Sequence, residues 1–429
     1  MYQTLFTIPQ QFAGIDVFGF GWVLGIWAVA AVVIMAVSYR RHGWGAETRG
    51  QLGAVLIVGL AIAFLLPNLM DERLGGLAIR GYGALLLVAV ASGVGLTMYR
   101  AERVGVNPEI CLSLGTWFFI WGIIGARAFY VIEYWERFQK PTLSETVFAI
   151  LNLTQGGLVV YGSLIAGGVA LILFVRKYHL PGLALADLIA PGVVLGVGLG
   201  RLGCFLNGCC YGGLSDLPWA VQFPPEAPAY IDQVEHGRLS LHGIRFDGEG
   251  DAPPVIAEVE PGSQAAESGL EKGDLVVAVG KQEVRTVEQA QRLMFGSFGE
   301  GAPISITVAD DAAPHAWKIA GPEPRSLPVH PTQLYSLIDA LLLCGLLLAF
   351  EPYKRRDGEL AAMVLTLHPI SRFLLEIIRI DEGAVLGTGM SISQNISIAI
   401  FLIGVGLWIY LLGFKSPGIA WQRRLAVAS

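Results

Sequence analysis

The chain has 429 residues, of which 54% are hydrophobic and only 15% are charged, and its mean hydropathy is +0.57. Soluble domains of this size rarely combine these values, so the composition favours a membrane protein. The formal net charge of -6 is weak, and the lack of any run of like charges argues against a nucleic-acid partner.

Long apolar stretches begin near the N-terminus and recur along the chain. Each is long enough to cross a bilayer as a helix, so the sequence predicts a mainly α-helical, polytopic membrane bundle of about nine spans. The N-terminal segment has no basic region ahead of its first apolar run, so we expect no cleaved signal peptide. The expected spans are residues 18–39, 52–69, 82–99, 111–132, 157–175, 183–203, 334–350, 359–378 and 395–413.

Lysine and arginine follow every second span, and this alternation predicts the orientation of the bundle. Short basic loops stay in the cytoplasm, so these loops mark the inner side of the membrane. We therefore expect the N-terminus outside and the C-terminus inside. The basic residues concerned are Arg40, Arg41, Arg100, Arg103, Arg176, Lys177, Lys354, Arg355, Arg356, Lys415, Arg423 and Arg424.

The segment between the sixth and seventh spans differs from the rest in composition. Residues 212–328 are rich in Glu, Asp, Pro and Gly and contain no spanning run, which predicts an extramembrane domain on the outer side. Within it, VIAEVEPGSQAAESGLEKGDLVVAVGKQEVRTVEQAQRLM and PISITVAD alternate short strands with a short helix and a longer one. This α+β pattern resembles a PDZ domain of the bacterial periplasmic kind.

The stretch LHGIRF resembles the loop with which such domains hold a peptide carboxylate. The resemblance implies that Leu241, Gly243 and Ile244 bind the C-terminus of an extended peptide, which adds a strand to the sheet. The alternative is a small β-rich spacer that binds no ligand.

A cluster of cysteines in GRLGCFLNGCCYGG ends the sixth span. Cys204, Cys209 and Cys210 have the spacing C-x4-C-C, without the second cysteine pair or nearby histidine of a structural zinc site, so we predict no metal. A disulfide from Cys204 to Cys209 or Cys210 is compatible with the outer side. Cys111 and Cys344 lie within apolar spans and are expected to be inert.

Arg201 lies in the same motif, just inside the end of the span. One interpretation is an arginine that reaches to lipid head groups from an apolar helix. The other is a phosphate ligand, because a guanidinium binds phosphate through two parallel hydrogen bonds. Asn207 and Gly212 follow in the motif, where its many glycines allow the backbone to approach a ligand closely.

The stretch LTLHPISRFLLEIIRIDE places charged residues on one face of the eighth span. His368, Arg372 and Glu376 are spaced four residues apart, and Arg379 follows three residues later. The simple interpretation is an ion pair within one helix. Because a charge inside a span costs about 2.5–3.5 kcal/mol, we favour a functional site.

Four shorter motifs add polar side chains to the outer ends of spans. VHPTQLYS offers His330, Gln333 and Tyr335 where the outer domain re-enters the membrane. The other three are GGLVVYGSLIAGG with Tyr161, GARAFY with Arg127 and IRGYGALL with Tyr82. Arginine, histidine and tyrosine side chains in glycine-rich clefts favour an anionic lipid head group as the ligand.

These motifs together resemble the bacterial prolipoprotein diacylglyceryl transferase family, most strongly through GRLGCFLNGCCYGG and LPVHPTQLYS. The resemblance covers roughly residues 79–240 and 326–415. It implies a transferase core in two parts, 79–240 and 326–429, with additional N-terminal membrane helices at 1–78 and a PDZ-like insertion at 241–325. It also implies a multi-pass protein of the bacterial inner membrane, with the inserted domain in the periplasm.

The resemblance implies transfer of a diacylglyceryl group from phosphatidylglycerol to the lipobox cysteine of exported precursors, without a cofactor. Arg201 and Arg372 would stabilise the departing phosphate, and Tyr161 and His330 are the other candidate catalytic residues. The implied substrate-binding residues are Tyr82, Arg127, Asn207, Gly212, Gln333, Tyr335, His368, Glu376 and Arg379.

Two departures from the family pattern and two other function classes remain open. Many members have Asn and Glu at the positions of Cys204 and Cys209, and some have His at the position of Tyr161, whose phenol with a pKa of about 10 is a poor base near neutral pH. The alternatives are a non-catalytic lipid-binding adaptor that presents clients through its PDZ-like domain, and an intramembrane protease that uses Ser163 with His330 or His368.

Overall fold

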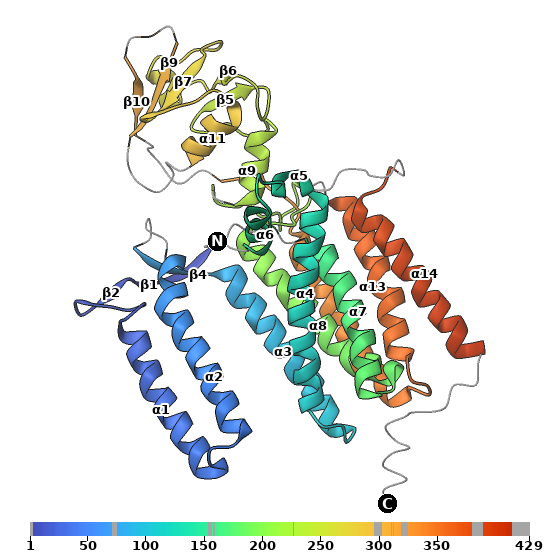
Figure 1. The fold of residues 1–429 in the computed structure, drawn as a ribbon. Helices are drawn as coiled ribbons and strands as arrows, with labels where there is room; N and C mark the ends of the chain where they lie inside the picture. Colours follow the sequence, from blue (N-terminus) through green and yellow to red (C-terminus); the bar gives the residue numbers. More distant parts are fainter. Residues whose placement is uncertain are drawn as a thin grey trace, which may run out of the picture. The chain divides into compact units, whose positions relative to one another are not determined.

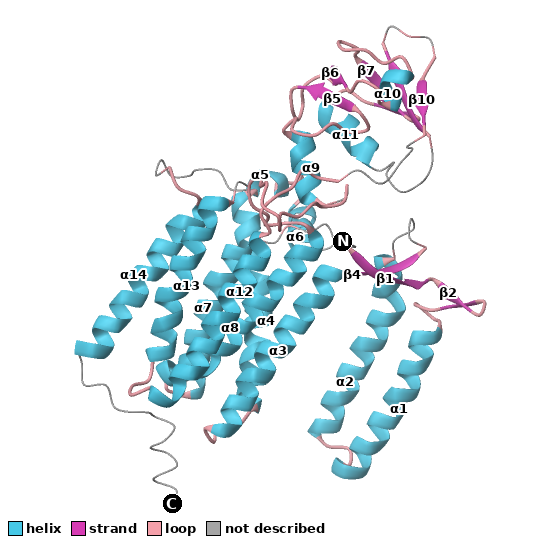
Figure 2. Ribbon diagram, turned by 180° about the vertical axis from the view of Figure 1, so that it is seen from behind, coloured by secondary structure: helices cyan, strands magenta, loops and turns pink. Residues whose placement is uncertain are grey.

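The computed structural model describes residues 3–70, 75–152, 157, 159–225, 227–295, 303–309, 311, 313–318, 325–379 and 389–413. The chain divides into two compact units, Met1–Ala84 and Leu85–Ser429. Strands occur in two regions, labelled β1–β4 near the N-terminus and β5–β10 within the second unit, and the remaining regular structure is helical (Figure 2).

The first unit is a helical hairpin with a small sheet. Helices α1 (Trp22–His42) and α2 (Ala46–Leu60) lie side by side, and α2 continues as the short turns η1 (Ala61–Leu65) and η2 (Leu66–Leu69) (Figure 1). Strand β1 pairs antiparallel with β4, and β2 pairs antiparallel with β3. The strand bounds are Thr4–Pro9 for β1, Gln11–Phe12 for β2, Ile15–Asp16 for β3 and Gly76–Arg80 for β4.

The second unit contains the main helical bundle. Helix α4 packs along α7, α8 along α12, and α13 along both α12 and α14 (Figure 2). Small residues allow these contacts: a Cβ added at Gly125 would lie 2.4 Å from the carbonyl oxygen of Gly162. The helices are α3 (Gly81–Arg103), α4 (Glu109–Glu133), α5 (Trp135–Phe138), α6 (Leu143–Leu151), α7 (Val160–Tyr178), α8 (Gly182–Asn207), α12 (Thr332–Phe350), η3 (Glu351–Tyr353), α13 (Glu359–Ile378) and α14 (Ile392–Gly413).

Eight helical segments among the described residues are long and apolar enough to cross a membrane. They fall on eight of the nine expected spans. The remaining expected span, residues 157–175 and the fifth along the chain, overlaps α7, a helix of 19 residues. The prediction of a polytopic helical membrane protein is therefore confirmed.

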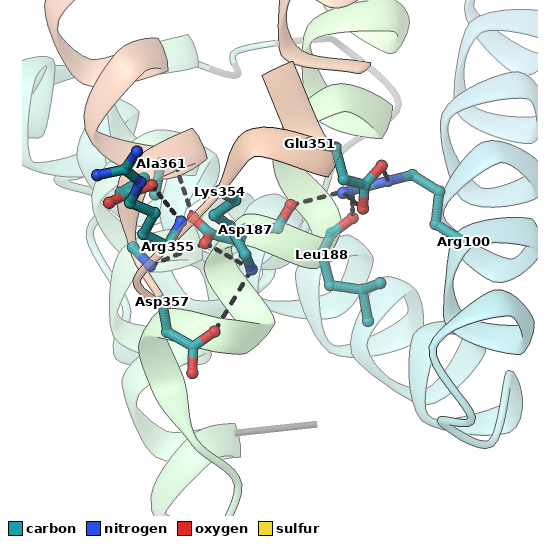
Figure 3. Close-up of polar contacts among 10 residues, drawn as sticks. Arg100, Asp187, Leu188, Glu351, Lys354, Arg355, Asp357 and Ala361 are labelled. Atoms are coloured by element: carbon teal, nitrogen blue, oxygen red, sulfur yellow. Dashed lines mark hydrogen bonds and ion pairs between the residues drawn. The ribbon is translucent and has the colours of Figure 1, made fainter. Parts of the chain in front are cut away.

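A buried carboxylate joins three helices at one end of the bundle. Asp187 of α8 is 1% exposed. Its Oδ2 accepts from Lys354 Nζ at 3.0 Å and from the backbone N–H of Gly358 at 2.8 Å, and its Oδ1 accepts from the N–H of Ala361 at 2.9 Å (Figure 3). Asp187 thus fixes the turn between α12 and α13 against the start of α8.

A proline inside α8 explains a second contact at this end. Because Pro191 has no N–H, it leaves the carbonyl of Asp187 without its usual helical donor. Arg100 of α3 donates from Nη1 to this carbonyl at 3.0 Å and also to the carbonyl of Leu188. Its guanidinium pairs with Glu351 through Nη2 at 2.6 Å and Nε at 3.2 Å (Figure 3). The carbonyl left free by Pro191 therefore provides a site where α3 is held.

An α+β region with its own core follows α8. Strands β10, β9, β7 and β8 form one antiparallel sheet in that order, and β5 and β6 form a second. The order of strands with a short and a longer helix matches the expected pattern. The elements are α9 (Pro228–Glu235), β5 (Ile244–Asp247), β6 (Val255–Val259), α10 (Gln264–Glu267), β7 (Val276–Val279), β8 (Gln282–Glu283), α11 (Val287–Phe295), β9 (Ile304–Val308) and β10 (His315–Trp317).

The core of this α+β region reaches beyond the expected start of the insertion at residue 241. Tyr230 and Val234 of α9 are 1% and 4% exposed and belong to the same apolar cluster as Leu241, Ile244 and Met294. The ring of Tyr230 meets that of Phe295 edge to face, with centroids 6.3 Å apart. Helix α9 is therefore part of the packed α+β region, because its apolar side chains lie in the same core cluster.

Candidate functional site

The cysteine motif forms the end of α8 and the turn that follows it. Gly208 adopts the left-handed conformation with φ 76° and ends the helix. The N–H of Gly208 bonds to the carbonyl of Phe205 at 3.3 Å, and the N–H of Cys209 bonds to that of Cys204 at 3.2 Å. These two bonds define a Schellman motif, so the glycine in the sequence sets where the helix stops.

Three distant segments are joined by backbone hydrogen bonds beyond this turn. The N–H of Gly212 donates to the carbonyl of His330 at 2.9 Å, and that of Gly213 donates to Ile378 at 2.8 Å. A Cβ added at Gly212 would lie 2.7 Å from the Cβ of His330 and 2.9 Å from Cγ2 of Thr332. Only glycine fits there, and the close approach brings the motif after α8, the start of α12 and the end of α13 together.

Two arginines share one buried carboxylate at the end of α13. Arg372 Nη1 pairs with Glu376, whose side chain is 2% exposed, and Arg379 Nη1 lies 3.5 Å from the same carboxylate oxygen. Arg372 also donates from Nη2 to Ser393 Oγ at 2.8 Å, and Ser391 Oγ donates to Glu376 Oε1 at 3.2 Å. The helical ion pair expected from the spacing is present, and the start of α14 completes it.

Arg201 lies near this cluster. It interacts electrostatically with His368 of α13, as do Arg372 and Asp339. Arg201 also interacts with the thiol of Cys210. The structure therefore brings Arg201 of α8 close to His368 and Arg372 of α13, and this approach of two distant helices is not encoded in any local pattern.

The start of α12 holds the cysteine turn in place. Thr332 Oγ1 donates to the carbonyl of Cys210 at 2.6 Å, and Gln333 Nε2 donates to that of Cys209 at 2.6 Å. Gln333 is 1% exposed. Among the described residues, its Oε1 is a buried oxygen without a hydrogen-bond partner. An unpaired buried acceptor is costly, so this oxygen is suited to a donor from a ligand.

A chain of polar contacts links the VHPTQLYS motif to the loop after the cysteines. Trp219 Nε1 donates to the hydroxyl of Tyr335 at 2.7 Å, and that hydroxyl lies 3.4 Å from Nδ1 of His330. Indole N–H is only a donor, so the Tyr335 oxygen accepts from Trp219 and keeps its own hydrogen and a second lone pair for His330. When the Tyr335 hydroxyl donates to Nδ1, the proton of a neutral His330 lies on Nε2.

Arg127 bonds to backbone carbonyls near the end of α6. Its Nη2 donates to Ala149 and Asn152 at 2.8 Å each, its Nε donates to Ile150 at 2.8 Å, and its Nη1 donates to Gly157 at 3.0 Å. Four of the five guanidinium donors are thus used on the protein's own backbone. These contacts show a structural role for Arg127, and its expected role in head-group binding stays a prediction.

The remaining expected site residues are less defined by contacts. The side chain of Tyr161 lies outside the described part of the chain. Tyr82 is 41% exposed in the first turn of α3, within the first compact unit. Asn207 is the last residue of α8 and hydrogen-bonds to the thiol of Cys209. Ser163 donates a hydrogen bond from its hydroxyl to the carbonyl of Gly122 at 2.9 Å. This contact gives Ser163 a role in helix packing and not the role of a nucleophile activated by histidine.

Sequence reasoning did not select several residues that build the site. Asp339 accepts from Ser371 at 2.7 Å, and Ser393, Thr332 and Trp219 hold Arg372, the cysteine turn and Tyr335. Asp339 could have been found, because it is a carboxylate inside a predicted span. The others are ordinary polar residues whose roles depend on long-range contacts.

The expected peptide loop forms a tight turn. The N–H of Leu241 bonds to the carbonyl of Ile244 at 2.8 Å, and the reverse bond is 3.0 Å long. Between them, His242 and Gly243 have positive φ values of 56° and 85°. The imidazole of His242 donates from Nε2 to the carbonyl of Met294 at 3.1 Å, which ties the turn to the end of α11. A neutral His242 fits this contact, because burial lowers its pKa to about 4.

Apolar spanning helices around an arginine-rich polar region define a multi-pass membrane protein with a cation-rich site. The family profile named prolipoprotein diacylglyceryl transferase matches residues 72–410. The chain belongs to this family and is a transferase of that class.

Relatives of the chain carry one name, phosphatidylglycerol–prolipoprotein diacylglyceryl transferase. The relative from Rhodopirellula baltica is 35% identical over 438 residues, which cover 93% of this chain and 87% of its own length. The relative from Corynebacterium efficiens is 26% identical over 79% of each chain. The relative from Trichormus variabilis is 38% identical over 168 residues, or 39% of this chain and 57% of its own.

Proposed function

We propose that this protein transfers the diacylglyceryl group of phosphatidylglycerol to the lipobox cysteine thiol of exported prolipoproteins. The substrate thiolate attacks the carbon of the diacylglyceryl group that bears the phosphate ester. A carbon–sulfur bond forms, the carbon–oxygen bond breaks, and glycerol phosphate leaves with the electron pair. The proton of the thiol must pass to a base or to water before or during this step.

The observation that carries this proposal is the cation cluster within the bundle. Arg372, Glu376 and Arg379 together have one net positive charge, and Arg201 adds a second near by. Negative charge grows on the phosphate oxygens as the ester bond breaks, so fixed guanidinium groups stabilise the transition state more than the ground state. Arg201 and Arg372 are assigned to this role, and Glu376 positions Arg372.

The head group of phosphatidylglycerol suits the polar groups at the start of α12. Its glycerol hydroxyls are hydrogen-bond donors, and the unpaired Oε1 of Gln333 is an acceptor that they can satisfy. Gln333 accepts a hydrogen bond, whereas His330 with its proton on Nε2 can donate one to a phosphate oxygen. We therefore assign His330 to proton donation, with Tyr335 positioning it.

The other predicted residues complete this assignment. Tyr82, Asn207, Gly212 and His368 are assigned to substrate binding. Tyr161 remains a candidate catalytic residue without an assigned proton-transfer step.

We also propose the orientation predicted from the basic loops, with the N-terminus outside and the C-terminus inside the bacterial inner membrane. The site lies where α8 and α13 end and α12 and α14 begin, and the buried network around Asp187 lies where α8 and α13 begin. With the site toward the outer leaflet, both phosphatidylglycerol and exported precursors can reach it. This orientation also places the α+β region in the periplasm.

The α+β region is proposed to dock a peptide C-terminus at Leu241, Gly243 and Ile244, as the PDZ resemblance implies. Docking near the site would raise the local concentration of a client. Tyr230 and Val234 of α9 are packed in the same core as this loop, so a peptide side chain there competes with α9.

Transfer is tested with the detergent-purified protein, phosphatidylglycerol vesicles and a lipobox peptide, with the thioether product detected by mass spectrometry. Arg372→Lys keeps the charge but loses paired hydrogen bonds, and we expect a loss of at least about 100-fold in kcat/KM. The matched control is Arg103→Lys at the far end of α3, which should retain wild-type activity. A wild-type protein that binds the lipid but yields no product would support the adaptor alternative.

The role of the α+β region is tested by a deletion of residues 241–325 closed with a short linker. The variant also carries Tyr230→Gln and Val234→Gln, because both side chains lose their buried partners. We expect transfer to a short lipobox peptide to remain and modification of full-length clients to fall. Loss of both reactions in a folded variant would make the region part of the catalytic structure and contradict docking.

A further inference from the structure

Three thiols meet at the end of α8, and the proposed transfer reaction uses none of them. The sulfur atoms of Cys204, Cys209 and Cys210 lie within 4.8 Å of one another. All three cysteines are half-buried, and none of them is in a disulfide. Thiols this close to one another can be oxidised to a disulfide or can bind a soft metal ion.

The backbone explains why the thiols converge. In a Schellman motif the side chains three residues before and two residues after the cap lie in contact, and here these are Cys204 and Cys209. Cys210 adopts a positive φ of 57°, which is uncommon for a residue other than glycine. The hydrogen bonds from Thr332 and Gln333 to the carbonyls of Cys210 and Cys209 fix this conformation.

The surroundings of Cys210 favour its thiolate. Hydrogen bonds from the thiols of Cys204 and Cys209, helped by the nearby charges of Arg379 and Arg201, lower the pKa of Cys210. The thiolate is the form that attacks a disulfide. Cys210 is therefore the thiol that we expect to attack an external disulfide, and the thiol of Cys204 is close enough to resolve the mixed disulfide.

We propose that these cysteines form an oxidation site in which Cys204 becomes disulfide-bonded to Cys209 or Cys210. The oxidant is an external disulfide such as glutathione disulfide. The Cys210 thiolate attacks one of its sulfur atoms and releases one glutathione thiolate. Cys204 gives up its proton and attacks the mixed disulfide at the Cys210 sulfur, which releases the second glutathione. Two protein thiols lose two electrons and two protons, and the external disulfide gains them.

The bond must use Cys204, because a disulfide between the adjacent residues Cys209 and Cys210 closes a strained small ring. The sulfur–sulfur distance has to shorten to about 2.05 Å. This movement pulls on the turn whose carbonyls hold Thr332 and Gln333, so oxidation acts directly on the start of α12.

The test uses the full-length protein in detergent, equilibrated with defined ratios of glutathione disulfide to glutathione. The sample is quenched with acid, its remaining thiols are alkylated, and it is weighed intact. We expect two of the five thiols to become unavailable. Chymotrypsin cuts after Phe205 and Leu206, between Cys204 and the other pair, so the expected disulfide gives two fragments joined by a reducible bond.

Variants separate this site from other thiol chemistry. Cys204→Ser should stop at a single glutathione adduct, and Cys209→Ser/Cys210→Ser should lose the joined fragments if Cys204→Ser fails to fold. The matched control is Cys344→Ser, whose buried thiol lies in α12 and whose loss should leave the reaction unchanged. Failure to form joined fragments at any ratio would overturn the proposal. So would stoichiometric zinc or copper that protects all three thiols from oxidation.

Discussion

Breaking the buried ion pair at the start of α8 should destabilise the whole bundle. Asp187→Asn removes the charge that Lys354 meets at 3.0 Å, and it turns an amide N–H₂ toward one of the N–H donors of Gly358 and Ala361. Removing one partner of a buried pair costs about 3–5 kcal/mol, because the other charge stays buried. Lys354 is 10% exposed and keeps Asp357 at 3.4 Å, so we expect the lower end, about 3 kcal/mol.

The assay is thermal unfolding in detergent, followed by tryptophan fluorescence, with a double-mutant cycle. A loss of about 3 kcal/mol corresponds to a fall of about 4 °C in Tm for cooperative unfolding of the whole second unit, Leu85–Ser429. Lys354→Met is the second arm, and the double variant should be less unstable than the sum of the two by about 1–3 kcal/mol, because neither Asp187 nor Lys354 is then left as the charged partner of a missing one. A fall below about 2 °C for Asp187→Asn, or strictly additive effects, would refute the reasoning.

Three further outcomes follow from single contacts. Arg127→Lys should speed hydrogen exchange at the end of α6 at least about tenfold, because four carbonyls lose their guanidinium donors. The KM for phosphatidylglycerol should change little. A raised KM with unchanged hydrogen exchange would instead favour head-group binding by Arg127. Acidification from about pH 6.5 to 4 should weaken the α+β region by up to about 3 kcal/mol, because unfolded chains protonate His242 while burial keeps it neutral in the fold. Hydrogen exchange of β5 measures this loss of stability. The variant His242→Gln should abolish the dependence of stability on pH that His242 causes. Tyr230→Ala should tighten binding of a peptide with an apolar C-terminus about tenfold in fluorescence anisotropy, and weaker binding would show that α9 does not compete.

Local patterns predicted the spanning helices and most elements of the α+β region, but not the strands β1–β4 or the short helices α5 and α6. The spans follow from apolar length, and the strands and helices of the α+β region follow from alternation, short turns and glycine positions. The end of α8 also follows from local chemistry, because Gly208 can adopt the left-handed conformation that closes a Schellman motif. Each of these features depends on residues only a few positions apart.

Partners distant in the sequence were not predictable from one chain. Asp187 and Lys354 are 167 positions apart, and Arg127 meets carbonyls more than 20 positions away. A motif can therefore identify a charged side chain inside a membrane but not what it contacts. Asp187 and Asp339 were not singled out, although both are carboxylates inside predicted spans, and both have structural partners.

The contacts at the exit of the α+β region explain how the helical core holds so long a segment between α8 and α12. The side-chain amide of Gln233, which is 1% exposed, accepts from the N–H of Leu327 at 2.7 Å and donates to its carbonyl at 3.4 Å. The N–H of Ser326 bonds to the carbonyl of Phe223 at 2.9 Å, and Ser326 Oγ accepts from the N–H of Phe223 at 2.9 Å. The chain thus returns to its point of departure before it enters α12. Because the cysteine turn holds the start of α12, the site is anchored on the side of the helical bundle, and variation within the α+β region need not reach it.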